Sequence, residues 1–298
     1  MKGTDLLVLE RICAERGIKM SVNQAQIDFW NGPTGQKWAK HQTDMDRNLA
    51  DIGAAAMVLA DARPGERVLD IGCGNGSTSL MLAEAVGPSG DVIGVDVSQP
   101  MLAIARTHVQ TPNIHFVEAD AAAYHFTSDR DLIFSRFGVM FFVEPVAAFT
   151  NIRKAAAKGA RLVFICWRSV EENEWAMRPY LAAMPFLPPQ QPVDTNAPGP
   201  FAFANPERTR GILAEAGFRG IAIEPFNGYM RLGVSPEHAA LQLTSLMGPT
   251  SRALKNVDEE TRAKARAAIA KDMAAFKGDA AEIAPGTACW LVSAKTGV

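Results

Sequence analysis

The chain has 298 residues, of which 48% are hydrophobic and 21% are charged, an ordinary composition for a globular protein with a sizeable core. Its formal net charge of −2 gives it no basic excess of the kind that drives binding to a phosphate backbone, so a nucleic-acid substrate is disfavoured. Its four cysteines are scattered and form no CxxC pair, which argues against a zinc site or a disulfide framework, and no metal is expected.

The first part of the chain is predicted to be helical. Residues 1–17 form an amphipathic helix candidate, in which acidic and basic residues interrupt the apolar stretch that a signal peptide would need. No long uncharged apolar span occurs anywhere, so no transmembrane segment is predicted and the cytoplasm is the expected location. We expect residues 1–60 to form an N-terminal helical cap.

From Arg67 onward, short β-branched runs alternate with helical segments, which is the pattern of a parallel α/β sheet. Because these runs are almost continuously apolar, we expect their strands to be buried on both faces. The predicted strands are Arg67–Ile71, Val92–Asp96, Ile114–Val117, Leu132–Ser135 and Arg161–Cys166. The predicted helices are Ser77–Val86, Gln99–Thr107 with Ser98 as its N-cap, and Pro145–Ala157.

Two helical insertions, at about 168–204 and 235–280, interrupt the later part of the pattern. The first runs into a proline-rich loop and is too long for a simple connector, so we expect it to lie over a binding site. Further N-cap signals predict helix starts at Asn205, Ser235 and Asp258, and further strands are predicted at Ile221–Pro225 and Ala288–Ala294. The fold class is therefore α/β, a Rossmann-like, mostly parallel sheet in a domain over residues 61–298.

The run VLDIGCGNG, Val68–Gly76, ends the first strand and opens the first helix of this domain. Glycines at these positions let the backbone turn tightly and approach a ligand, and the helix that follows offers free amides. A second acid, Asp96, ends the next strand, where it can accept hydrogen bonds from both hydroxyls of a ribose. The combination predicts a site for a nucleoside cofactor.

Four segments in this order, VLDIGCGNGSTSLMLA, VIGVDVSQPMLAIAR, HFVEADAAAY and DLIFSRFGVMFF, resemble the class I S-adenosylmethionine-dependent methyltransferases. Within that family they are similar to the small-molecule group of ubiquinone and menaquinone biosynthesis. The resemblance covers residues 65–226, and the last strand is similar to the antiparallel strand that the family adds to its sheet. It implies S-adenosyl-L-methionine as the cofactor and methyl transfer as the reaction.

The resemblance assigns a part of the cofactor to each motif. The acid and glycines of the first motif would hold the methionine part, Asp96 the ribose, and Met101 one face of the adenine. Arg136 could pair with a carboxylate of cofactor or substrate, with Asp70, or in a purely structural ion pair. The cofactor-binding candidates are Asp70, Gly72, Gly74, Gly76, Asp96, Met101, Asp120, Ala121, Ser135 and Arg136.

The residues after the fourth strand bear on the acceptor. They read SRFG and lack the Asn/Asp-Pro-Pro-aromatic tetrapeptide of enzymes that methylate nucleobase amino groups. We therefore expect a hydrophobic phenol, quinone-type ring or secondary metabolite, methylated on oxygen or carbon. His41 is the catalytic candidate, because imidazole exchanges protons near neutral pH. The substrate-pocket candidates are Trp30, Trp38, Phe137, Met140 and Phe141.

Two alternatives stay open at this stage. A protein of this kind could bind S-adenosylmethionine for a purpose other than methylation. An NAD(P)-dependent oxidoreductase is disfavoured, because its GxGxxG fingerprint needs a third glycine one position after Gly76. The sequence also leaves the oligomeric state open, a homodimer included.

Overall fold

A computed structural model describes residues 22–190, 194–277 and 282–297. The amphipathic helix predicted at residues 1–17 therefore lies outside the described residues, as does Cys13. The described chain contains a seven-stranded sheet in the order β3-β2-β1-β4-β5-β7-β6. β1 to β5 run parallel, whereas β7 pairs antiparallel with both β5 and β6, as the sequence predicted for the last strand.

The strands follow the predicted apolar runs, and several extend beyond them. Because β1 to β5 are parallel, their carboxyl ends share one edge of the sheet, where open α/β sheets bind ligands. The strands are β1 (Arg67–Ile71), β2 (Asp91–Asp96), β3 (Ile114–Glu118), β4 (Arg130–Arg136), β5 (Ala156–Trp167), β6 (Phe218–Tyr229) and β7 (Gly286–Thr296).

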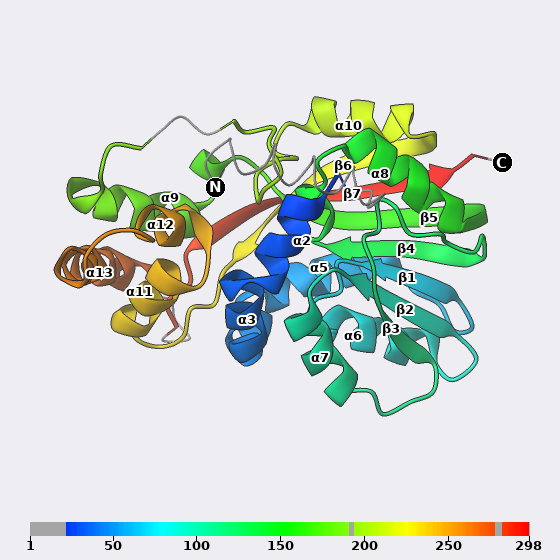
Figure 1. Cartoon of the computed structure of the whole chain (residues 1–298), viewed down its shortest axis with the longest axis horizontal. Helices are drawn as coiled ribbons and strands as arrows, with labels where there is room; N and C mark the ends of the chain where they lie inside the picture. Colours follow the sequence, from blue (N-terminus) through cyan, green and yellow to red (C-terminus); the bar gives the residue numbers. More distant parts are fainter. Residues whose placement is uncertain (1–21, 191–193, 278–281, 298) are drawn as a thin grey trace, which may run out of the picture.

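Helices pack on both sides of this sheet. Figure 1 shows α8 and α10 on one side and α6 and α7 on the other. None of the described helices is long and apolar enough to cross a lipid bilayer. The α-helices are α2 (Gln24–Asn31), α3 (Pro33–Lys40), α4 (Gln42–Asn48), α5 (Ala50–Ala60), α6 (Ser77–Val86), α7 (Gln99–Thr107), α8 (Pro145–Ile152), α9 (Glu174–Ala183), α10 (Pro206–Glu215), α11 (Pro236–Ser245), α12 (Gly248–Ala253) and α13 (Glu259–Met273).

The predicted helix Pro145–Ala157 is too long. The α-helix ends at Ile152, a 3₁₀ turn follows, and Ala156 already pairs with Arg130 of β4. Alanine favours helix, but the strand pairing across the sheet outweighs this local preference. β5 consequently begins five residues before its predicted start at Arg161.

The predicted N-caps mostly behave as expected. The side chains of Asn205, Ser235 and Asp258 accept hydrogen bonds from main-chain amides in the first turns of α10, α11 and α13. Ser98 precedes α7 as predicted, but its hydroxyl does not cap that helix. It donates instead to the carbonyl oxygen of Trp30, 2.8 Å away, and so ties α2 to the sheet edge.

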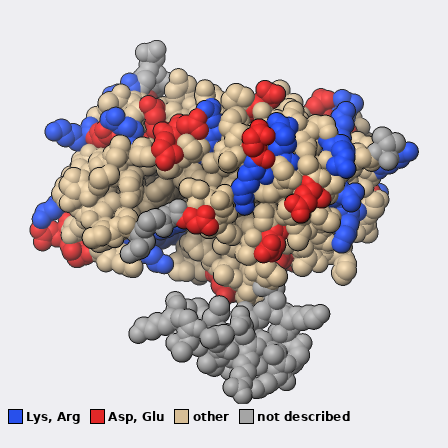
Figure 2. Space-filling model, turned by 90° about the horizontal axis from the view of Figure 1, so that it is seen from above, with Lys and Arg blue, Asp and Glu red and all other residues tan. Residues whose placement is uncertain are grey.

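The two insertions form one helical lobe, which we define as α9, α11, α12 and α13. An ion pair between Arg178 and Asp272 joins α9 to α13. Figure 1 shows this lobe at the end of β6 and β7, with α2 and α3 between it and the parallel strands. Acidic and basic side chains are interspersed on the face shown in Figure 2.

Candidate functional site

A glycine loop joins β1 to α6 at the carboxyl edge of the sheet. Gly72, Gly74 and Gly76 all adopt positive φ angles, of 68°, 56° and 85°. A Cβ atom on Gly72 would lie 2.6 Å from the Cα atom of Gly138, so this position has no room for a side chain. The loop therefore turns sharply and lies directly against the chain that follows β4.

Asp70 lies beneath this loop and is fully buried. Its Oδ2 atom accepts hydrogen bonds from the hydroxyls of Thr78 and Ser79, at 2.8 and 2.6 Å. Its Oδ1 atom has no hydrogen-bond partner within the described part of the chain. Burial raises the pKa of the Asp70 carboxyl to about 6, although the two hydroxyls act in the opposite direction.

Asp96 connects β2 to the glycine loop. One carboxylate oxygen accepts a hydrogen bond from the amide of Gly74 and the other from the amide of Ser98, both at 2.8 Å. Burial raises the pKa of Asp96, and these main-chain donors oppose the shift. Met101, the predicted adenine contact, is buried near Gly74, where a Cβ atom would lie 2.8 Å from the methionine Cε.

Asp120 follows β3 and contacts the N-terminal helical segment. Its Oδ1 atom accepts hydrogen bonds from the side-chain amide of Asn23 and from the main-chain amide of Ala122, both at 3.0 Å. The side-chain oxygen of Asn23 accepts a hydrogen bond from the amide of Val143. Ala121 is buried beside this group.

Ser135 and Arg136, at the end of β4, differ in burial and in their hydrogen-bond partners. Ser135 is fully buried, and its hydroxyl donates to the carbonyl oxygen of Ile71 at 2.7 Å. The Arg136 Nη2 atom lies 2.8 Å from the Ser77 hydroxyl and 3.4 Å from a carboxylate oxygen of Asp46. The sequence left several partners open for Arg136. In the structure it pairs with Asp46 on α4, and the described contacts include no hydrogen bond between Arg136 and Asp70.

Phe137 has an unusual backbone conformation for a bulky residue, with φ at 65°. Its amide donates to the carbonyl oxygen of Ile165, and its ring stacks on Trp167 with centroids 4.3 Å apart. This support outweighs the cost of the left-handed conformation, which is typically about 1–3 kcal/mol. Met140 follows in a 3₁₀ turn and is buried, with 2% of its surface exposed.

Aromatic rings gather beside the same edge. Trp30 contacts Trp38 and Phe141 edge to face, with ring centroids 5.8 and 5.1 Å apart. The side chain of His41 lies between α3 and α4, where its Nδ1 atom is 3.7 Å from a carboxylate oxygen of Asp44.

A cavity of about 60 Å³ lies among these groups. It brings together six predicted site residues from α3, the glycine loop, α7, β4 and the chain after β4, and its other lining residues were not predicted from the sequence. The predicted residues are Trp38, Gly72, Gly74, Met101, Arg136 and Phe137, and the additional ones are Met45, Asp46, Leu49, Cys73, Asn75, Ser77 and Thr78. His41 does not line it.

The lining residues that were not predicted differ in whether the sequence could have indicated them. Met45 lies on α4 and Leu49 directly follows that helix, four positions later, a helical spacing that indicates a buried face but gives no hint of a ligand. Asn75 lies inside the glycine motif, and its Oδ1 atom is buried without a hydrogen-bond partner in residues that the structure describes. The motif itself could have indicated this amide oxygen, as well as the neighbouring Cys73.

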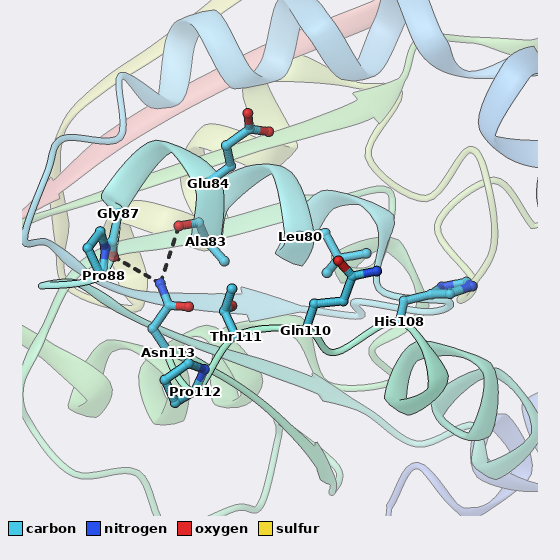
Figure 3. A pocket seen from close by; sticks show the side chains of 10 residues that line it. All are labelled: Leu80, Ala83, Glu84, Gly87, Pro88, His108, Gln110, Thr111, Pro112 and Asn113. Atoms are coloured by element: carbon cyan, nitrogen blue, oxygen red, sulfur yellow. Dashed lines mark hydrogen bonds between the residues drawn. The ribbon is translucent and has the colours of Figure 1, made fainter.

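A larger cavity, of about 660 Å³, lies elsewhere, between α6 and residues 108–113. Figure 3 shows Asn113 there, with its side-chain amide donating to the carbonyl oxygens of Ala83 and Gly87. None of the predicted site residues lines this larger cavity. We therefore locate the candidate site at the smaller one, where Asp46, the glycine loop and Arg136 converge.

Comparisons with known proteins identify the kind of domain that contains this site. The sequence pattern of a family described as a methyltransferase domain matches residues 68–159. The demethylmenaquinone methyltransferase of Thermus thermophilus is 31% identical over 192 residues, which are 59% of this chain and 87% of that protein. Aklanonic acid methyltransferase DauC of Streptomyces sp. is 32% identical over 154 residues, or 50% of this chain and 61% of DauC.

The fold also resembles solved structures. Phosphoethanolamine N-methyltransferase 2 of Haemonchus contortus, solved with phosphomonomethylethanolamine and S-adenosylhomocysteine, matches with a TM-score of 0.58 and 16% identity. The match covers 94% of this chain and 61% of that one. Among the curated relatives compared, the matched share of their own length ranges from 35% to 87%.

Proposed function

Because this chain belongs to the class I S-adenosylmethionine-dependent methyltransferases, whose cofactor is S-adenosylmethionine, we propose that it methylates a small hydrophobic acceptor. The acceptor class that we propose is a phenol, a quinone-type ring or a secondary metabolite, methylated on oxygen or carbon. Family membership leaves the oxidoreductase alternative without support. The cytoplasm remains the predicted location.

The residues at the sheet edge suit the cofactor chemically. Asp96 would accept hydrogen bonds from the ribose, Asp120 from the adenine amino group, and Met101 would cover the adenine. The buried Oδ1 atoms of Asp70 and Asn75 lack partners among the described residues and are able to accept further hydrogen bonds.

The size of the cavity implies that the site changes shape when the cofactor binds. Its volume is about 60 Å³, whereas ligand pockets usually have roughly 300–1,000 Å³. α2 and α3 cover this edge through contacts such as those of Trp30 with Ser98 and of Asn23 with Asp120. We propose that these two helices move outward to admit the cofactor.

The observation that carries the acceptor proposal is the apolar wall of the cavity. Trp38, Met45, Leu49 and Phe137 surround the group formed by the glycine loop and Arg136. Relatives named for demethylmenaquinone and for aklanonic acid support a ring-containing acceptor of this kind. An apolar wall binds such a ring by removing its surface from water, about 25 cal/mol per Å².

S-adenosylmethionine supplies a methyl group already activated by a sulfonium. The protein's contribution would then be to hold the acceptor in line with this group and to exclude water, which Trp38 and Phe137 are suited to do. An acceptor that carries a proton would also need a base. His41 remains the predicted base, although it does not line the cavity and would have to move toward the cavity when α3 closes again over the bound cofactor.

The proposal is tested with S-adenosylmethionine labelled in the methyl group and with a panel of phenols, hydroquinones and polyketide acids. Transfer of label to one of these acceptors, lost in Asp96→Ala, is the expected result. Label found only on nucleic acid or protein would contradict the acceptor class. Tight binding of S-adenosylhomocysteine without transfer to any acceptor would favour the non-methylating alternative.

A further inference from the structure

An ion pair lies within the candidate site and has no role in the function described so far. Asp46 and Arg136 both line the 60 Å³ cavity, and their side chains are 3.4 Å apart. Among the residues that line this cavity, Asp46 is the only carboxylate and Arg136 the only cation. Ion pairs on a protein surface contribute little to stability, whereas this one is partly enclosed beside the glycine loop.

Asp46 is held in place by its neighbours on α4. Met45 and Leu49 flank it and are buried, with 3% and 4% of their surface exposed. Asn48, on the same short helix, is fully buried with its side-chain amide 2.6 Å from that of Gln242 in α11. These buried contacts hold α4 in place, and Asp46 lines the cavity from this helix.

Arg136 is held from the opposite side. It ends β4, 16% of its side chain is exposed, and its Nη2 atom contacts the Ser77 hydroxyl at the start of α6. The contact with Asp46 involves this same nitrogen at the longer distance of 3.4 Å. The guanidinium therefore has further donors with which to bind a planar carboxylate in two-point fashion.

This arrangement matches one chemical group closely. An α-amino acid carries an ammonium and a carboxylate on one carbon, and a separated anion and cation bind such a zwitterion with complementary charge. The methionine part of the cofactor is an α-amino acid, and the glycine loop that would hold it borders the same cavity. In the absence of the amino acid, the two protein charges satisfy each other.

We propose that Asp46 binds the α-ammonium group and Arg136 the α-carboxylate of the cofactor's methionine part, so that the ligand replaces the ion pair between the two side chains. This inference rests on the proposed function and adds Asp46, from outside the sequence motifs, to the cofactor site. α4 then belongs to the binding site as well as to the hydrophobic core.

Calorimetry with two cofactor analogues tests the proposal without turnover. S-adenosylhomocysteine contains the amino acid, and 5′-methylthioadenosine keeps the nucleoside but lacks the amino acid. Asp46→Asn should weaken binding of S-adenosylhomocysteine roughly tenfold to a hundredfold and leave that of methylthioadenosine unchanged. Asp44→Asn is the matched control, because Asp44 lies on the same helix but pairs with Arg47 and does not line the cavity.

The proposed contact between Arg136 and the α-carboxylate of the ligand is tested with an analogue of S-adenosylhomocysteine that lacks only this carboxylate. Wild-type protein should bind it more weakly than S-adenosylhomocysteine, whereas Arg136→Lys, which loses the planar fork but keeps the charge, should discriminate less between the two. Circular dichroism confirms that each variant is folded.

Each contrary result has a distinct meaning. If Asp46→Asn bound both nucleosides as wild type does, Asp46 would not contact the cofactor and the proposal would be overturned. Equal weakening for both nucleosides would also overturn it, since the effect would then be on the site as a whole. Wild-type protein that bound neither nucleoside would overturn the cofactor assignment itself. This result differs from the two above, which would overturn only the proposed contacts of Asp46 and Arg136.

Discussion

At the scale of single residues, Asp96 has the most direct test. Its two carboxylate oxygens already accept main-chain hydrogen bonds, which fixes the direction in which the remaining lone pairs point. Replacing Asp96 with alanine should cost about 1.5–3 kcal/mol of binding free energy, or roughly tenfold to a hundredfold in affinity for S-adenosylhomocysteine. Calorimetry measures this loss, and NADH should not bind at all. Binding of NADH in place of the sulfonium cofactor would contradict the ribose assignment.

Gly74 and Gly72 should respond differently to substitution. Valine at position 74 would place a β-branched side chain at a φ of 56° while displacing only the flexible end of Met101. We expect Gly74→Val to abolish cofactor binding in calorimetry while circular dichroism shows a folded protein. Gly72→Ala should lower the melting temperature as well, because its Cβ would meet the backbone of Gly138. Gly211→Ala, in open space on α10, is the control, and normal binding by Gly74→Val would mean that the loop does not face the ligand.

The buried carboxyl of Asp70 predicts a particular dependence of stability on pH. Its pKa is raised to about 6 from 3.8, so the unfolded chain loses this proton at a lower pH than the folded one. The folded state therefore loses stability as pH rises from near 3.8 through about 6, by roughly 3 kcal/mol in all, and the loss levels off about one pH unit above the folded-state pKa.

Asp70→Asn keeps an oxygen for the two hydroxyl donors but cannot ionise. Urea unfolding of both proteins should show the variant gaining stability relative to wild type from about pH 4, with the gain levelling off near pH 7. A difference that stays constant over this range would show that folding does not raise the pKa of Asp70.

At the scale of elements, α2 and α3 are the least anchored of the helices around the site. α2 buries none of its residues, and α3 buries only Gly35. Elements with little buried surface open at low free-energy cost, so amide hydrogen exchange over residues 22–40 should be fast without ligand. S-adenosylhomocysteine should slow it, because a closed cap excludes water from the site. β1 should be protected in both states, and unchanged exchange over residues 22–40 would rule out a mobile cap.

The first insertion fits the expected role over the site less well. α9 buries Trp175, Ala176, Pro179 and Ala183 and is bound to α13 within the helical lobe. Its sequence is long for a connector, and that length alone suggested a cover for the site. The structure instead gives α9 a core of its own, so ligand-dependent exchange should be smaller there than in α2 and α3.

At the scale of the whole molecule, the sequence predicted what depends on local pattern. The run Leu132–Ser135 could be recognised as a strand because a strand buried on both faces is mostly apolar, and the glycine motif predicted the edge of the sheet at which a ligand would bind. Asp46 could not be found in this way, because a single acid on a short helix carries no motif. Only packing of α4 against the sheet brings it to Arg136, 90 residues later in the chain.

The strand order also constrains how the protein is made. Among the strands that the structure describes, β7 is the only partner of β6, and 56 residues, from 230 to 285, separate the two. During synthesis β6 therefore emerges with both backbone edges unpaired, and it stays so until the helical lobe and β7 have followed. Unpaired strand edges are templates for pairing with other chains, so a newly made chain is exposed to aggregation during this interval. Three side chains of β6 are charged or polar and exposed in the folded protein, and they are suited to keep the strand soluble until β7 has been made: Arg219, Glu224 and Asn227.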